Sequence, residues 1–425
     1  MQREIQVLDK PPLLPGLMLS LQHLFAMFGS TILVPNLFNV DPGIVLLMNG
    51  LGTLLYLILC RGLIPAYLGS SFAFIAPVTI VLAGHAENYS KALGAFIVCG
   101  LVFVVVALIV KWIGTRWLDV LFPPAAMGAI VAVIGLELIP VAAGMSDFIP
   151  GQDGVIDPAN VKLALLTLGV TVIGTVMFRG FLKIIPVLIG IITGYVAAYF
   201  MGVINMDSVA NAPLFKLPTF TYPEFDMTAI LIVLPAALVV IVEHVGHLMV
   251  TSNIVGSDLS KKPGLHRSLL GNGISTIISG FLGSTPNTTY GENIGVMALT
   301  RVYSVYVIGG AAVIAIAMSF LGKVSALIAN IPVAVMGGVS LLLFGIIAAS
   351  GFRILIESKV NLGNPKDMLL TTLVIVIGIS HAQLKIGDVE LKGMALATVL
   401  AIVLNLFFII IEKLGLSNDK EPTSH

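Results

Sequence analysis

Three ionisable side chains stand in stretches of the chain that are otherwise apolar. Glu243 and His247 lie four residues apart in the run Val239–Leu248, and a helix would place them on one face. Glu292 opens a second apolar stretch. A carboxylate at the centre of a membrane helix costs roughly 2.5–3.5 kcal/mol, so it persists there chiefly where it has a function. Two carboxylates and an imidazole can hold and pass a proton, and we expect these three residues to form a proton relay.

Each of these residues also has a purely structural interpretation. Glu243 could hold a hydrogen bond, Glu292 could cap the positive end of a helix, and His247 could be a packed, neutral histidine. His244 points to another face of the same helix, and we expect it to be structural. The order Glu243-His244-x-x-His247 differs from the zinc motif His-Glu-x-x-His, whose histidines share one helix face, so the sequence predicts no metal site.

Two short apolar segments interrupt the helical pattern with polar residues and prolines. The segment Leu68–Phe74 follows Pro65, and the segment Ser284–Gly291 contains Pro286. Because proline breaks helices, and serine and threonine suit extended backbone, we expect a short strand followed by a half-helix in each. Lipid excludes such backbone, so both should meet inside the protein, exposing N–H groups and positive helix ends. Ordinary kinks in packed helices are the alternative. His23 is expected to brace the neighbouring broken segment.

Composition places these elements in a membrane. Hydrophobic residues make up 57% of the 425 residues and charged residues 10%, with a mean hydropathy of +1.05. Soluble proteins carry roughly 25% charged residues, so this chain must use lipid as a solvent. The pattern predicts an all-α integral membrane protein with about fourteen transmembrane segments, some of them too short to be whole helices. The formal net charge of +0 gives no basis for nucleic-acid binding.

The distribution of lysine and arginine predicts the topology. With the N-terminus inside, most basic residues fall at the cytoplasmic ends of the expected spans, whereas the other side holds only Lys91, Lys162, Lys216, Lys323, Lys385 and Lys392. This bias predicts a multi-pass protein of the cytoplasmic (inner) membrane with both termini in the cytoplasm.

The two halves of the chain share short patterns in the same order. Asn49-Gly50-x-x-Thr53 recurs as Asn272-Gly273-x-x-Thr276, and Pro123-x-Ala125-x-Met127-Gly128 recurs as Pro332-x-Ala334-x-Met336-Gly337. The first unit holds an odd number of expected spans, about seven, so the second must enter the membrane from the opposite side. An inverted repeat is typical of secondary transporters, whose substrate site lies near the midplane, and makes a channel or a membrane enzyme less favoured.

Four motifs resemble the nucleobase–cation symporter family, also called nucleobase–ascorbate transporters, and in particular its bacterial uracil permeases. The resemblance runs from Pro11 to Ile411. The motifs are the signature Glu292–Arg301, the pair Gln22-His23, the stretch Glu243–His247 and the run Gly283–Glu292.

This resemblance implies a seven-plus-seven inverted repeat divided into a core and a gate. The core would comprise residues 1–115 (spans one to four) and 227–323 (spans eight to eleven). The gate would comprise residues 116–226 (spans five to seven) and 324–425 (spans twelve to fourteen and a cytoplasmic tail). In the family the core moves against the gate, and protomers pair as homodimers.

The resemblance also implies a substrate site. Carboxylates matching Glu243 and Glu292 and backbone amides matching Phe72 and Gly291 would hold the substrate, with Tyr290 lining the site. His247 would assist proton coupling together with the two carboxylates. Two positions depart from the family pattern, since Phe344 replaces a tyrosine of some uracil permeases and Ser30 replaces an alanine. The remaining expected residues are Ser71 at the substrate and, as structural support, Gln22, His23 and Asn293.

These residue types fit uracil, a neutral planar ring whose edge alternates N–H donors and C=O acceptors. Carboxylates accept from N–H, backbone N–H groups donate to carbonyls, and aromatic rings can cover the ring faces. Two carboxylates in one dry pocket repel each other, which favours a proton on one of them. The sequence therefore predicts import of uracil by proton symport, with the proton as coupling ion, no cofactor, and membrane lipid as surroundings. A purine (xanthine or urate) symporter and an inverted-repeat anion carrier remain alternatives.

Overall fold

The computed structural model describes residues 4–82, 85–150, 154–380, 382–386 and 389–416, and most of them are helical. Within this part of the chain, seven helices are long and apolar enough to cross a membrane, and one bent pair of helices can form another span. The seven are α3 (Pro42–Leu59), α5 (Tyr89–Ile113), α7 (Pro124–Met145), α8 (Pro158–Met177), α11 (Met227–Val255), α16 (Val333–Glu357) and α18 (Gly393–Lys413). The prediction of a helical integral membrane protein is confirmed.

Polar residues and prolines set the starts of several of these helices. A side-chain oxygen of the residue before the helix accepts a backbone N–H of the first turn, which satisfies a donor that the helix itself cannot. The capping residues are Asp41 for α3, Asp157 for α8, Asp226 for α11, Ser304 for α14 (Val305–Ser319) and Asn364 for α17 (Pro365–Ile379).

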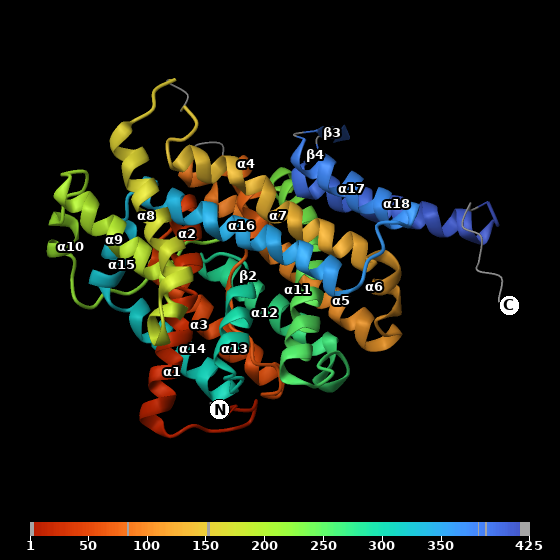
Figure 1. The fold of residues 1–425 in the computed structure, drawn as a ribbon, viewed down its shortest axis with the longest axis horizontal. Helices are drawn as coiled ribbons and strands as arrows, with labels where there is room; N and C mark the ends of the chain where they lie inside the picture. The colour runs from red at the N-terminus through yellow and green to blue at the C-terminus, as the bar shows by residue number, and fades with distance from the viewer. Residues whose placement is uncertain (1–3, 83–84, 151–153, 381, 387–388, 417–425) are drawn as a thin grey trace.

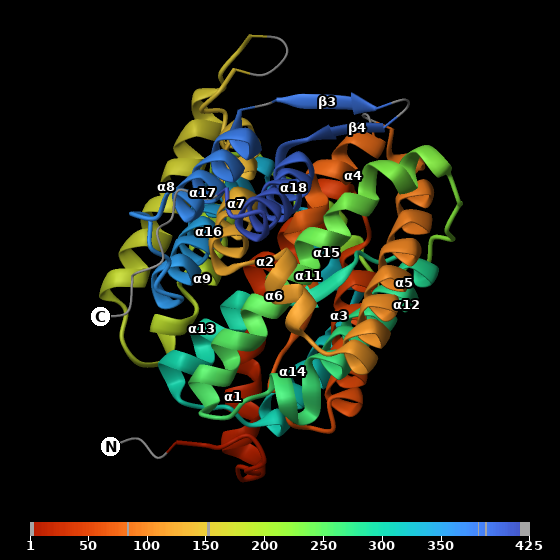
Figure 2. The same ribbon diagram turned by 90° about the vertical axis from the view of Figure 1, so that its right-hand side faces the viewer.

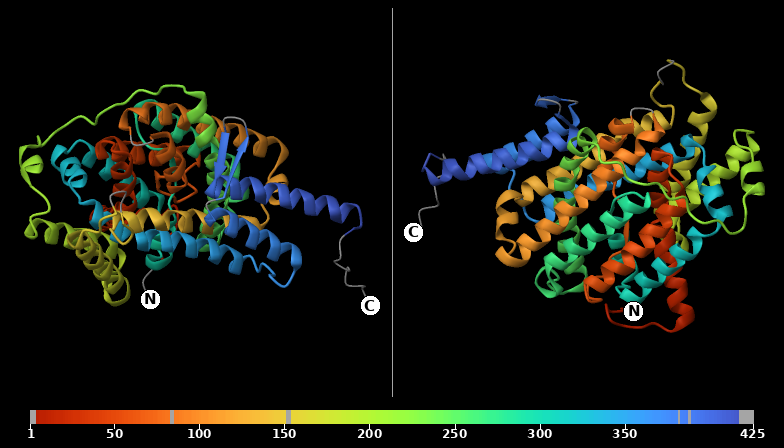
Figure 3. Two further views of the ribbon diagram at one scale, coloured as in Figure 1. Left: turned by 90° about the horizontal axis from the view of Figure 1, so that it is seen from above. Right: turned by 180° about the vertical axis from the view of Figure 1, so that it is seen from behind.

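One group of helices packs in a continuous row, seen from behind in Figure 3. Helix α1 (Leu13–Ala26) packs against α14, α14 against α3, α3 against α12 (Leu265–Leu282), α12 against α5, and α5 against α11. Small residues allow the close approach: a side chain at Gly52 would collide with Ser275, and one at Gly273 would meet the Gly100 carbonyl. Such small-residue contacts are the usual means by which membrane helices associate.

A second group of helices lies beside the first. Helices α7 and α16 run along each other through the middle of Figure 1, α8 packs on α16 and on α9 (Pro186–Phe200), and α17 packs on α7 and α18. Gly351 of α16 lies directly against the backbone of Ala132 in α7. The remaining helices are short: α2 (Phe28–Phe38), η1 (Phe72–Phe74), α4 (Ile75–Leu82), η2 (Ala86–Asn88), α6 (Arg116–Leu121), η3 (Gly180–Ile184), α10 (Asp207–Asn211), η4 (Ser260–Gly264), α13 (Gly291–Thr300) and α15 (Gly322–Ala329).

Two three-residue strands lie side by side at the centre of the molecule. Strand β1 (Leu68–Ser70) pairs antiparallel with β2 (Asn287–Thr289), with Gly69 opposite Thr288. Helix η1 follows β1 after one residue, and α13 follows β2 after one residue. The expected order of strand and short helix is therefore present in both segments. Thr53 accepts the Leu68 N–H at 2.9 Å, and Thr276 donates to the Asn287 carbonyl at 3.1 Å, so each strand is fastened to its neighbouring helix.

Three features of the fold were not predicted from the sequence. The first apolar stretch of the chain is divided into two helices, α1 and α2, which join at Met27. A hairpin of β3 (Gln383–Ile386) and β4 (Val389–Lys392) precedes α18, at the end of the molecule opposite the N-terminus (Figure 2). The non-helical segment 212–226 makes hydrogen bonds to residues at the ends of three helices. The N–H groups of Lys216 and Glu224 donate to the carbonyls of Phe320, after α14, and Ser90, in the first turn of α5, and Thr219 N–H donates to the carboxylate of Asp41, before α3.

Candidate functional site

Helix α11 places Glu243 and His247 beside the paired strands. Glu243 is partly buried, and its Oε2 atom is shielded from solvent with no hydrogen-bond partner among the described residues. One turn further, the Nδ1 atom of His247 lies 3.1 Å from the hydroxyl of Thr289 in β2. A buried carboxylate oxygen without a hydrogen-bond partner lowers the stability of the folded protein. Such an atom therefore marks a position where a ligand or a proton can bind.

The second carboxylate comes from the half-helix after β2. Glu292 is in the first turn of α13, and it lies close enough to Glu243 for the two carboxylates to interact electrostatically. Gly291 lets the start of α13 lie close to α11, because a Cβ atom on this glycine would be only 3.2 Å from Nε2 of His247. The structure thus brings the three residues of the expected proton relay together at one place.

Two backbone N–H groups point from the broken segments without acceptors in their own helices. Phe72 is the first residue of η1 and Gly291 the first of α13, and neither helix has a side-chain cap. The strands fix both amides in place, since Ser71 N–H donates to Pro286 at 2.9 Å and Tyr290 N–H donates to Tyr67 at 3.1 Å. Such N–H groups are available to carbonyl oxygens of a ligand.

Three aromatic rings surround the same place. The rings of Phe72 and Tyr290 are nearly parallel, at 13° with centroids 6.5 Å apart. Phe344 of α16 meets Phe72 edge to face, with centroids 5.8 Å apart. All three residues are buried. Because Phe344 belongs to the second group of helices, the site contains a contact between the two groups.

The supporting residues form hydrogen bonds behind the site. The Nδ2 atom of Asn293 donates to Nδ1 of His23 at 3.1 Å, and its Oδ1 atom accepts the Tyr67 N–H at 3.2 Å. His23 therefore joins α1 to both broken segments, and Gln22 is buried beside it. The hydroxyl of Ser71 is buried with no hydrogen-bond partner in the described part of the chain. The side chain of Ser30 lies outside the described residues.

His244 belongs to a separate network. Its Nε2 atom lies 2.7 Å from the hydroxyl of Ser268, which is 2.6 Å from the hydroxyl of Tyr56. These contacts face away from Glu243 and join α11, α12 and α3. Among the residues described, no group of three or more His, Cys, Asp or Glu side chains is arranged to hold a metal ion. Sequence reasoning did not identify Thr289 or Tyr67 as partners, although the polar run containing Thr288 and Thr289 was a usable signal.

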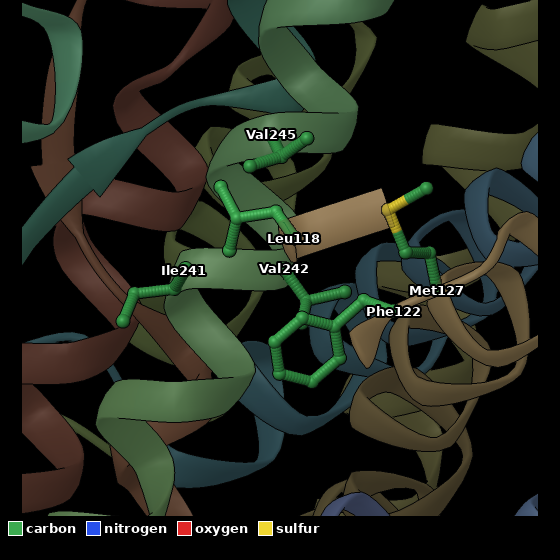
Figure 4. Close-up of a pocket in the computed structure, with 6 residues that line it drawn as sticks. All are labelled: Leu118, Phe122, Met127, Ile241, Val242 and Val245. Atoms are coloured by element: carbon green, nitrogen blue, oxygen red, sulfur yellow. The ribbon is translucent and has the colours of Figure 1, made fainter. Parts of the chain in front are cut away.

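Apolar side chains next to Glu243 face the second group of helices. A narrow pocket of about 10 Å³, roughly the space that one water molecule needs, lies there and is shown in Figure 4. Its lining comprises Ile241, Val242 and Val245 from α11, Leu118 from α6, and Phe122 and Met127 beside and within α7. The face of α11 next to Glu243 is therefore covered by apolar side chains.

The family model described as "Permease family" matches residues 16–387. The chain belongs to this permease family. A uracil permease of Paenibacillus larvae subsp. larvae is 61% identical over 98% of this chain and 99% of its own length. A uracil permease of Escherichia coli (strain K12) is 59% identical over 97% of this chain and 96% of its own length. Membership makes the chain a membrane transporter rather than an enzyme.

Solved structures at low identity share the fold of this permease. The transmembrane domain of the cyanobacterial bicarbonate transporter BicA has a TM-score of 0.65 at 13% identity, covering 94% of this chain and all of that domain. The structure of SLC26A9 has a TM-score of 0.71 at 11% identity, covering 94% of this chain and 66% of that one. These similarities concern the fold alone.

Proposed function

We propose that the chain imports uracil by proton symport. The observation that carries this proposal is the juxtaposition of three features: the buried Oε2 atom of Glu243, which has no hydrogen-bond partner among the described residues, the carboxylate of Glu292, and the first backbone amides of two short helices, those of Phe72 and Gly291. Carboxylates accept from the ring N–H groups of uracil, and the amides donate to its carbonyls. The faces of Phe72 and Tyr290 suit a flat ring.

Proton coupling follows from the same residues. Two carboxylates in one dry site disfavour a second negative charge, so one of them binds a proton readily. His247 lies between Thr289 and Gly291, one turn from Glu243, where it can exchange that proton. Since uracil is neutral, it gains driving force from a proton gradient only when a proton moves with it.

The relatives favour a pyrimidine over a purine as the cargo. Proteins named uracil permease are 46–61% identical over nearly the whole chain, and a protein named putative pyrimidine permease RutG is 36% identical. A purine symporter of the same fold is the second candidate, and competition by xanthine against labelled uracil distinguishes them. An anion carrier shares the fold, but two adjacent carboxylates would repel its cargo.

We further propose a seven-plus-seven inverted repeat of about fourteen spans, with a core of residues 1–115 and 227–323 and a gate of residues 116–226 and 324–425. The helix contacts support this, because contacts recur when the two halves are exchanged. The contact of α1 with α14 corresponds to that of α11 with α5, and the contact of α8 with α16 corresponds to that of α17 with α7. Alternating access would occur by movement of the core against the gate. The basic residues support cytoplasmic termini in the inner membrane, and a homodimer is expected from the family resemblance.

Uptake into proteoliposomes tests the proposal. Purified protein should concentrate labelled uracil when the outside is acidic, and a protonophore should abolish the concentration while leaving exchange of uracil intact. Excess xanthine should not compete. Uptake that ignores the proton gradient would contradict symport, and efficient competition by xanthine would favour the purine alternative.

A further inference from the structure

An open cleft of about 370 Å³ lies between the last turns of α11 and α16, away from the residues of the candidate site. It is lined by Val250, Asn253, Ile254, Arg353 and Glu357. Val7 of the N-terminal segment packs in a cluster with Val250 and Ile254, so the cleft opens at the end of the molecule where the N-terminus lies. Under the proposed topology this is the cytoplasmic end.

The cleft continues the helix face that carries Glu243. Residues 243, 246, 250 and 253 of α11 are spaced by three or four, so they follow one another along a single face. Between Glu243 and the cleft the two helices touch: a Cβ atom on Gly246 would lie 3.3 Å from Cδ1 of Ile354. Gly246 and Ile354 therefore form a constriction between the candidate site and the cleft.

The cleft combines polar groups with an apolar wall. The amide of Asn253, an exposed residue, offers a donor and an acceptor side by side in one plane. Arg353 Nε donates to Glu357 at 2.6 Å, and the arginine side chain is 63% exposed, so its remaining N–H groups are accessible. Val250 and Ile254 supply the apolar wall. A neutral planar ring with adjacent N–H and C=O groups matches these features.

We propose that the cleft is a second, weaker binding site for the cargo, occupied after the cargo leaves Glu243 and Glu292 and passes the constriction. The ligand class is a neutral heterocycle with an imide or amide edge, held by Asn253 and the Arg353–Glu357 pair. This proposal rests on the proposed function. Because the cleft opens on one side only, its loss changes transport from that side and leaves binding from the opposite side intact.

Transport of labelled uracil in right-side-out and inside-out membrane vesicles tests the second site. Asn253→Leu removes the amide at similar volume, and we expect it to raise KM severalfold in inside-out vesicles and less than twofold in right-side-out vesicles. Asn253→Gln restores an amide and should lie close to wild type on both faces. Ile354→Ala widens the constriction, so efflux from right-side-out vesicles should accelerate while their uptake KM changes less than twofold.

Three results would overturn the second site. Equal changes of KM on both faces would mean that Asn253 acts through the fold, and no change on either face would mean that the cleft does not hold cargo. A one-sided effect of Asn253→Leu that disappears in reconstituted vesicles without anionic lipid would assign the cleft to a lipid headgroup. Wild-type uptake is measured first: its absence contradicts the proposed function, whereas normal wild-type uptake with symmetric variants contradicts the second site alone.

Discussion

Asn293 donates a hydrogen bond to His23 at 3.1 Å, which links the half-helix beside the candidate site to the first helix of the chain. The same asparagine accepts the buried Tyr67 N–H just before β1. One side chain therefore holds both broken segments in register with α1. Movement of this asparagine would displace Gly291 and Glu292 from the amide of Phe72.

Asn293→Ala should destabilise the protein and weaken uracil binding. It leaves the Tyr67 N–H and a buried His23 nitrogen unpaired, at a cost of about 1–3 kcal/mol each. Asn293→Asp keeps the acceptor for Tyr67 and should lose less stability. Thermal unfolding in detergent, with and without uracil, measures both changes, and equal unfolding temperatures for the alanine variant and wild type would contradict the bracing role.

Gly291→Val should abolish uracil binding while the protein still inserts in the membrane. Its side chain would start 3.2 Å from His247 and crowd the backbone that faces the ligand. Gly295→Ala is the matched control on the same helix, since a Cβ atom there meets nothing within 4 Å. Calorimetric binding of uracil distinguishes them. Similar affinities for the two variants would show that the ligand does not approach Gly291.

Removal of the carboxylates and of the imidazole should separate binding from coupling. Glu243→Ala and Glu292→Ala should each lose uracil binding by roughly 1–3 kcal/mol, which is about 5- to 150-fold, because a ligand group is left unpaired. His247→Leu should keep part of the binding but fail to concentrate uracil. Parallel binding and gradient-driven uptake measurements test this. Normal accumulation by His247→Leu would make His247 a packing residue.

A fusion reporter tests the orientation of the chain. Both termini should face the cytoplasm because basic residues gather on that side. A reporter that works only in the cytoplasm should be active when it is joined after Glu412. A reporter that works only outside the cytoplasm should be active when it is placed in the β3–β4 hairpin. A periplasm-active fusion after Glu412 would reverse the topology and the side assigned to the cleft.

Asp41 gives a prediction of pH-dependent stability outside the membrane spans. Burial alone would raise the pKa of Asp41, but hydrogen bonds from Gly43 and Thr219 and the charge of Lys216 outweigh it and lower the pKa below 3.8. The lowered pKa means that Asp41 stabilises the folded state above its ordinary pKa and loses this effect as the pH falls through the folded value.

Asp41→Asn should therefore lower the unfolding temperature near neutral pH, because the amide has one acceptor oxygen where the carboxylate has two and loses the ion pair with Lys216. The difference from wild type should shrink as the pH falls below the ordinary pKa of the carboxyl. Asp157→Asn, which caps α8 without contacting the segment 212–226, is the control. A difference that stays constant with pH would contradict this role.

The sequence predicted the site better than its surroundings. Pro65, Pro286 and the Ser/Thr runs identified both broken segments, because proline and extended-backbone residues act locally. Glu243, His247 and Glu292 were conspicuous because charge is rare in apolar spans. The partners Thr289 and Tyr67 were missed, since their contacts depend on which distant segments pair. The cleft at Asn253 and Arg353 was missed for the same reason. The break at Met27 was missed because no proline precedes it to mark the end of a helix.

The pairing of β1 with β2 has a consequence for how the protein is made. Ser70 lies opposite Asn287, so the first strand is synthesised long before its partner. Until the second strand arrives, the backbone groups of residues 68–70 have no strand partner in a medium that offers no water. Membrane insertion of the first half must therefore precede completion of the site. A chain that stalls before residue 287 can carry Phe72 and its amide, yet has no transport site.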